Sequence, residues 1–75
     1  MKIIRLVSID DGGAIYVDGK LHHEDHSVHI EFLPMNEPIK IVTNAYLENS
    51  AVVERIYDEG FPQNYADIKD AVDAD

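Results

Sequence analysis

A cluster of imidazole and carboxylate side chains near the end of the first third of the chain has the residue types to bind a metal. Its members are His22, His23, Glu24, Asp25, His26 and His29. Such groups are ligands for Zn²⁺, Ni²⁺ and Cu²⁺, but alternate side chains of a strand point to opposite faces, and the spacing matches no standard metal motif. We therefore expect a polar loop and no metal or cofactor. A metal- or small-ligand-binding accessory domain that uses the four histidines is the alternative.

Nucleophilic catalysis would need a serine beside a base and an orienting acid. Ser27 follows His26 directly, but adjacency in sequence does not make a catalytic triad, and Ser27 is better placed to cap a helix. Gly12 and Gly13 follow two aspartates and indicate a turn, not a phosphate-binding loop that opens a helix. We therefore predict that the protein is not an enzyme.

The net charge excludes two classes of partner. Fifteen acidic residues against six basic ones give a net charge of −9 and a pI near 4.6. Such a chain repels phosphate backbones and anionic membrane surfaces, so we expect neither direct nucleic-acid binding nor membrane binding. The acids are concentrated after residue 47, and we expect this part of the chain to contact a basic surface of another protein.

The C-terminal acids fall at helical intervals. Glu54 and Asp58 are one turn apart, and Asp67, Asp70 and Asp73 recur every third residue, which would form a ridge of negative charge on a helix. Neighbouring aromatic residues, Tyr57 among them, would supply the anchoring energy of an interface. The predicted partner-binding residues are Glu54, Asp58, Glu59, Phe61, Tyr65, Asp67 and Asp70. The alternative is a solvated face that keeps a small domain soluble.

Length and composition indicate how many elements can position these groups. A chain of 75 residues that is 45% apolar folds as a single domain, residues 1–75, with one small core. No apolar run approaches the 18 or so residues of a membrane span, and the N-terminal run ends at Asp10 without a cleavage-site pattern. The absence of cysteine fits a cytoplasmic location.

The N-terminal third predicts a three-stranded meander. Residues 2–9 are rich in isoleucine and valine on both faces, which is typical of a central strand. Asp18 and Gly19 separate two apolar runs and are the residues that a type I′ hairpin requires. This turn would place Tyr16 opposite Leu21 and Ile15 opposite His22.

The rest of the chain predicts one later strand and two helices. The pattern over residues 28–33 allows strand or helix, and residues 39–43 should rejoin the sheet with Ile39 and Ile41 inward. A helix over residues 50–59, capped by Asn49 or Ser50, should end at a left-handed Gly60. Tyr65, Ile68 and Val72 predict a short C-terminal helix. The fold class is therefore α+β: a small, mainly antiparallel sheet, with the meander and one later strand, packed on one helix.

Two passages carry a longer pattern, "YvDGKL-EgHS … G-P-n-di". The matching residues are Ile15, Tyr16, Val17, Asp18, Gly19, Lys20, Leu21, Glu24, His26, Ser27, Gly60, Pro62, Asn64, Asp67 and Ile68. The pattern resembles that of a family of small bacterial proteins of unknown function. The chain departs from it at Asp25, where the family has glycine, and in the added His22, His23 and His29. The resemblance implies a short helix over residues 28–35 and implies no activity.

These observations together predict a small acidic module that binds the basic surface of another protein. Size and charge favour an inhibitor or regulator of a host protein, carried by a phage or a mobile element. Carboxylates in place of phosphates would allow such a module to mimic nucleic acid toward a DNA- or RNA-binding protein. The oligomeric state stays open.

Overall fold

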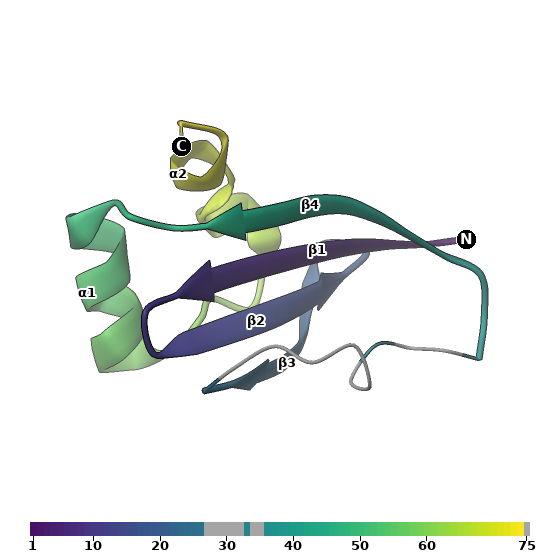
Figure 1. Cartoon of the computed structure of the whole chain (residues 1–75), viewed down its shortest axis with the longest axis horizontal. Helices are drawn as coiled ribbons and strands as arrows, with labels where there is room; N and C mark the ends of the chain where they lie inside the picture. The colour runs from purple at the N-terminus through teal and green to yellow at the C-terminus, as the bar shows by residue number, and fades with distance from the viewer. Residues whose placement is uncertain (27–32, 34–35, 75) are drawn as a thin grey trace.

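The N-terminal half of the chain is a sheet and the C-terminal part is helical. The structure is a computed structural model that describes residues 1–26, 33 and 36–74 (Figure 1). The strands are β1 (Lys2–Ile9), β2 (Gly12–Val17), β3 (Lys20–Asp25) and β4 (Ile39–Tyr46). The helices are α1 (Ser50–Glu59) and α2 (Lys69–Ala74), and the 3₁₀ turn η2 (Tyr65–Asp67) precedes α2. The prediction for residues 28–33 falls, except for Leu33, outside the described residues.

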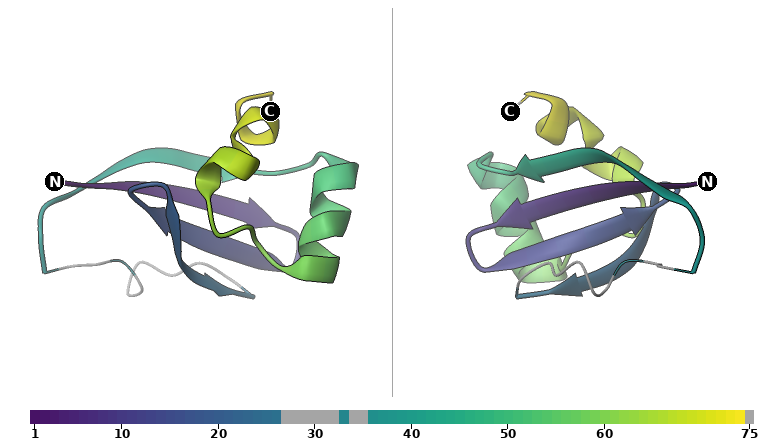
Figure 2. Two further views of the ribbon diagram at one scale, coloured as in Figure 1. Left: turned by 180° about the vertical axis from the view of Figure 1, so that it is seen from behind. Right: turned by 45° about the vertical axis from the view of Figure 1, so that its right-hand side comes forward.

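The sheet has the strand order β3-β2-β1-β4, so β1 is a central strand as predicted. β1 pairs antiparallel with β2 and parallel with β4, and β2 pairs antiparallel with β3. The left view of Figure 2 shows η2 and α2 in front of the sheet and α1 at its end. The predicted α+β class is confirmed: a three-stranded meander and a later strand pack on one helix, with a short C-terminal helix.

The main core lies between the sheet and the helical elements. Its buried members are Val7, Ile9, Ala14, Tyr16, Leu47, Ile56, Phe61, Tyr65, Ile68 and Val72. The predicted apolar face of the C-terminal segment is therefore confirmed. The opposite face of the sheet carries a smaller cluster of Ile4, Ile15 and Leu33, so β1 is covered on both sides. The core thus fixes where α1 and the residues after it stand relative to the sheet.

The predicted hairpin turn is confirmed. Asp18 and Gly19 have φ values of 51° and 84°, and Tyr16 faces Leu21. The Asp18 carboxylate also accepts a hydrogen bond from the backbone N–H of Ile3 at 3.0 Å, which lowers the pKa of Asp18. The predicted pairing of Ile15 with His22 is wrong, because a bulge in β3 places His23 opposite Ile15. An edge strand accommodates such an extra residue with only a local loss of pairing.

Gly19→Val should destabilise the domain by about 1 kcal/mol or more, because a β-branched residue is strained at positive φ. A Cβ atom at this position would meet nothing within 4 Å, so the cost comes from the backbone and not from a clash. Thermal melts of Gly19→Val and of the matched control Gly19→Asn check this. Asparagine tolerates positive φ and should cost clearly less; equal melting temperatures for the two variants would contradict the assignment.

Two details of the later elements differ from expectation. Ile41 is 47% exposed and is not covered as expected, although it pairs with the buried Ile4, because β4 is an edge strand of the sheet. After Ile41, a bulge at Val42 shifts the register, so that Arg5 pairs with Thr43. Gly60 has a positive φ of 83° but a ψ of 174°, so the helix does not end in the expected left-handed conformation. The backbone N–H of Gly60 nevertheless bonds to Ile56 O at 2.8 Å and ends α1 there.

Candidate functional site

Helix α1 is the element that carries most of the predicted acids to the surface. It begins at Asn49, whose side chain accepts a hydrogen bond from Val52 N at 3.2 Å, as a capping residue does. Ile56 is its one buried side chain, and the partly buried Val52 and Val53 also pack against the core. The face of α1 opposite these residues is exposed, and a hollow lies on each side of the helix.

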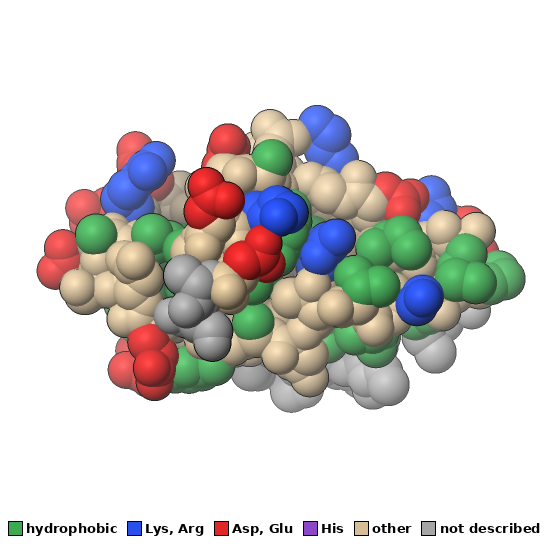
Figure 3. Space-filling view, turned by 90° about the horizontal axis from the view of Figure 1, so that it is seen from above, with side chains coloured by type: hydrophobic (Ala, Val, Ile, Leu, Met, Phe, Trp, Pro, Cys, Tyr) green, Lys and Arg blue, Asp and Glu red, His purple; other side chains and the backbone are tan. Residues whose placement is uncertain are grey.

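The first hollow, which we call the tyrosine groove, lies between α1 and the end of β4. It has a volume of about 340 Å³ and is lined by Asp10, Tyr46, Leu47, Glu48, Ser50, Val53, Glu54 and Tyr57. Three of these residues are carboxylates and none is lysine or arginine. Figure 3 shows acidic side chains gathered at the end of the molecule that α1 occupies, on the left of the view. The groove therefore has a negative potential.

Two tyrosine rings give the groove its apolar surface. Tyr46 and Tyr57 are 49% and 53% exposed, which is unusual for large side chains in a domain with so small a core. The Tyr46 hydroxyl donates a hydrogen bond to the Asp10 carboxylate. This bond, partial desolvation and the nearby carboxylates raise the pKa of Tyr46 to about 12. Tyr46 therefore stays neutral at physiological pH, and its orientation is fixed by Asp10.

The acids on α1 differ in how they are paired. Glu59 Oε2 lies 3.7 Å from Arg55 Nε, so these residues, one helical turn apart, form an ion pair. Glu54 and Asp58 are exposed, and neither forms an ion pair with another described residue. The unpaired negative charge of α1 is thus on the side of Glu54, which lines the tyrosine groove.

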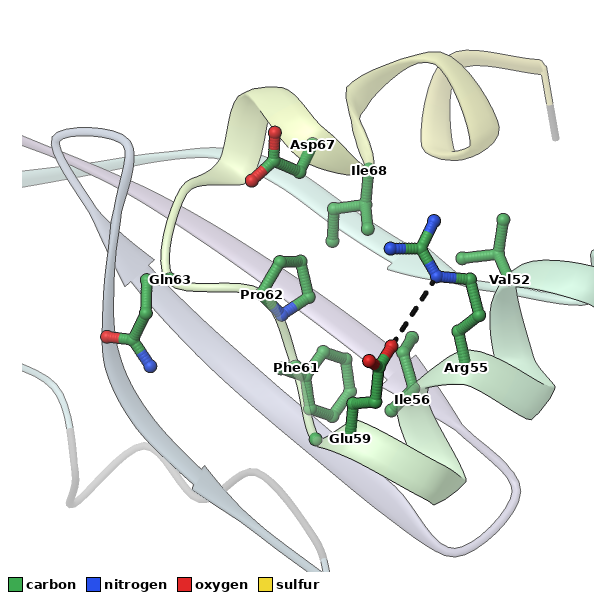
Figure 4. A pocket seen from close by; sticks show the side chains of 10 residues that line it. Val52, Arg55, Ile56, Glu59, Phe61, Pro62, Gln63, Asp67 and Ile68 are labelled. Atoms are coloured by element: carbon green, nitrogen blue, oxygen red, sulfur yellow. Dashed lines mark ion pairs between the residues drawn. The ribbon is translucent and has the colours of Figure 1, made fainter.

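The second hollow, the apolar pocket, lies between α1 and the segment that follows it (Figure 4). It has a volume of about 280 Å³, and its apolar lining includes Val52, Ile56, Phe61, Pro62 and Ile68. The charged groups at its rim are Asp67 and the Arg55–Glu59 pair, which Figure 4 shows to the right of the Phe61 ring. Because Arg55 compensates Glu59, this rim is less negative than the tyrosine groove.

The structure separates the residues predicted to bind a partner. Glu54 lines the tyrosine groove, Asp58 is exposed one turn further along α1, Glu59 and Asp67 line the apolar pocket, and Asp70 is exposed on α2. The expected continuous ridge from Asp67 to Asp73 does not form, because the turn η2 ends at Ile68, with φ −123° and ψ 0°, before α2 begins. The acids therefore belong to several surfaces and not to one.

The two predicted aromatic anchors are core residues. Phe61 and Tyr65 are only 6% and 4% exposed, so neither is available on the surface as predicted. Tyr65 packs edge to face on Tyr16 with ring centroids 5.6 Å apart, and the Arg5 guanidinium lies 4.5 Å from the Tyr65 ring. Phe61 is held by a hydrogen bond from its backbone N–H to Glu24 Oε2 at 3.0 Å. These contacts stabilise the fold.

Tyr46 and its partner Asp10 are candidate site residues that the sequence did not predict. Among the described residues, the large exposed aromatic rings are Tyr46 and Tyr57, of which the sequence indicated only Tyr57 as a neighbour of the acids. The one available signal is a tyrosine three residues after the end of the predicted strand 39–43. Its contact with Asp10 joins positions 36 residues apart, which no local pattern reveals.

The histidine cluster is spread along β3 and beyond it. His22 and His26 are exposed, His23 lies 3.8 Å from the Asp25 carboxylate, and Glu24 is engaged with Phe61. Within the described part of the chain, no three histidine or acidic side chains are grouped so that they could hold a metal ion. His29 lies outside the described residues.

Comparison with known proteins adds no relative: no family model, no curated protein and no solved structure matches this chain. The resemblance to a family of small bacterial proteins therefore stays a prediction. Within residues 1–26, 33 and 36–74, no helix is long and apolar enough to cross a membrane.

Proposed function

We propose that this protein is a non-enzymatic binding module whose tyrosine groove takes an arginine side chain of a basic protein partner. The observation that carries the proposal is the composition of the groove: two half-exposed tyrosine rings stand beside three carboxylates, and no lysine or arginine lines it. Such a groove suits an arginine side chain, because aromatic rings can stack on the flat guanidinium cation and carboxylates can accept hydrogen bonds from its N–H groups.

The physical preference is for arginine over lysine. A guanidinium group stacks on an aromatic ring and donates paired hydrogen bonds to a carboxylate. The ammonium group of lysine is a compact point charge that cannot stack or form this paired contact. A guanidinium between Tyr46 and Tyr57 would lie within reach of the acids on the groove wall, Glu54 among them. Such aromatic–arginine contacts commonly dominate the energy of an interface.

The net charge of −9 also supports a basic partner, because its electrostatic attraction acts over a longer range than the contacts in the groove. A strongly acidic protein attracts a basic partner and raises the rate of encounter. A module of this kind fits an inhibitor or regulator that occupies the basic, nucleic-acid-binding surface of a host protein. The unpaired carboxylates Glu54 and Asp58 would then stand where phosphates of the nucleic acid otherwise bind.

The test is the affinity of tetra-arginine and of tetra-lysine, measured by fluorescence anisotropy at equal ionic strength. We expect tetra-arginine to bind the unmodified chain about twofold to fivefold more tightly, the order of one exposed cation–π contact. Tyr57→Ala should remove this preference, and the exposed control Gln63→Ala should keep it. Equal affinities of the two peptides for the unmodified chain would contradict the proposal.

The apolar pocket supports a second candidate function. Its five apolar side chains and its volume of about 280 Å³ suit one small apolar ligand. This corresponds to the small-ligand alternative of the sequence, but at α1 and not at the histidines. Amide shifts around Phe61 on titration with a small aromatic compound would favour it, and shifts confined to the tyrosine groove would not.

A further inference from the structure

The two edges of the sheet differ in how far other parts of the chain cover them. At β3, Lys20 pairs with Asn64 in an isolated antiparallel bridge, and Leu21 donates its backbone N–H to Gln63 O at 2.8 Å. The segment after α1 therefore covers part of this edge. β4 is the last strand on the other side, and no strand of the described residues lies along its outer edge. Open edges are usually protected, because they pair readily with other chains.

The outer backbone groups of β4 can be identified from the ladder. Leu47 donates its backbone N–H to Ser8 O at 2.8 Å, so the backbone of Leu47 points toward β1. Successive residues of a strand direct these groups to alternate edges. The N–H and C=O groups of Asn44 and Tyr46 therefore point outward, where a further strand would bond to them.

The second half of β4 lacks the features that usually protect an open edge, whereas the first half has a lysine and a bulge. In a chain with fifteen acids, β4 contains none, and Lys40 is its one charged residue. Ile41 and Val42 are 47% and 43% exposed. The bulge at Val42 interrupts the first half of the strand, which leaves the half that contains Asn44 and Tyr46 as the regular edge. That half leads directly into the tyrosine groove, because Tyr46 belongs to both.

We propose that the outer edge of β4 pairs with an extended, arginine-bearing segment of the partner protein, which adds one strand to the sheet and places an arginine in the tyrosine groove. This inference rests on the proposed function and specifies the form of the partner. Backbone pairing along a free edge supplies affinity, and a pocket for one side chain supplies selectivity. Charge complementarity at the groove selects a basic segment over a second copy of this acidic chain.

The experiment uses a peptide of alternating arginine and threonine, long enough to span β4, and the variant Asn44→Pro. Proline removes the outward N–H of Asn44 and leaves the bonds to β1 intact, as edge strands allow. We expect Asn44→Pro to bind this peptide at least about tenfold more weakly than Asn44→Ala, which keeps the N–H. Tetra-arginine, too short to pair along the edge, should bind both variants equally.

Hydrogen exchange of the unmodified chain gives an independent measure should Asn44→Pro fail to fold. Saturation with the alternating peptide should slow exchange of the Asn44 and Tyr46 amides by about tenfold or more, since exchange reports on hydrogen bonding. Unchanged exchange at both amides would overturn the inference, as would equal peptide affinities of the two Asn44 variants. Slowing that depends on protein concentration without peptide would assign the edge to a second copy and overturn it too. Failure of the proposed function would show separately, as equal binding of tetra-arginine and tetra-lysine.

Discussion

Tyr16→Ala is expected to lower the melting temperature of the domain by more than about 12 °C, because it removes a large part of the stability of a small core. Tyr16 is fully buried at the centre of the main core, contacts the Tyr65 ring, and donates a hydrogen bond to Pro62 O at 2.7 Å. Replacing a buried aromatic ring by alanine costs about 3–5 kcal/mol. A domain of this length has a total stability of roughly 4–11 kcal/mol. Circular dichroism melts should therefore show a melting temperature lower by more than about 12 °C; a shift of only a few degrees would contradict the described core.

Tyr16→Phe separates the hydroxyl group from the ring. It keeps the packing and removes the bond to Pro62, so it should cost about 1–2 kcal/mol. Burial, and then the charges of Glu24 and Asp67, raise the pKa of Tyr16 above its ordinary value of 10.0 in the folded chain. Because the unfolded chain ionises first, the stability that Tyr16 contributes is complete below pH 10 and is lost as the pH rises further. The stability of Tyr16→Phe should therefore fall less steeply above pH 10 than that of the unmodified chain.

Removing the negative charge of the tyrosine groove is expected to weaken binding of arginine peptides by about tenfold or more, since several close carboxylates act together. The variant is Asp10→Asn, Glu48→Gln and Glu54→Gln, which replaces the three carboxylates of the groove lining and keeps side-chain volumes nearly constant. Its salt dependence should also be flatter, because fewer charges remain to be screened. Anisotropy titrations with tetra-arginine at two ionic strengths measure both effects.

The matched control for that variant removes the same charge elsewhere. Glu37→Gln, Asp67→Asn and Asp70→Asn also raise the net charge by three, and all three side chains are exposed away from the groove lining. We expect its affinity to fall by less than about threefold, the residual effect of net charge alone. An equal loss in both variants would mean that total charge governs binding and that no groove is involved.

Local signals in the sequence predicted the elements well. The Asp18-Gly19 turn, the central position of residues 2–9, the Asn49 cap and the stop at Gly60 all depend on residues close together in the chain. Each signal has one physical cause, such as positive φ at Gly19 or a side-chain acceptor at Asn49. The α+β class follows from these elements and their order.

The site was predicted only in part, because exposure depends on distant partners. Ile41 is exposed because β4 lies at the edge of the sheet, a position that only the pairing of β4 with β1 determines. Phe61 and Tyr65 follow α1 in sequence and were expected beside its acids, but Tyr65 packs on Tyr16, which lies far away in the chain. The sequence correctly predicted acids on α1, but it did not predict that Asp10 lies beside them, because that position depends on tertiary contacts.

The most direct test of the tyrosine groove is an amide-shift titration of the isotopically labelled chain with tetra-arginine. The groove predicts saturable shifts that are largest at Tyr46, Leu47, Val53, Glu54 and Tyr57, and that are lost in Tyr57→Ala. Shifts spread evenly over the acidic residues of the chain, or largest around Phe61 and Asp67, would contradict arginine recognition at this groove.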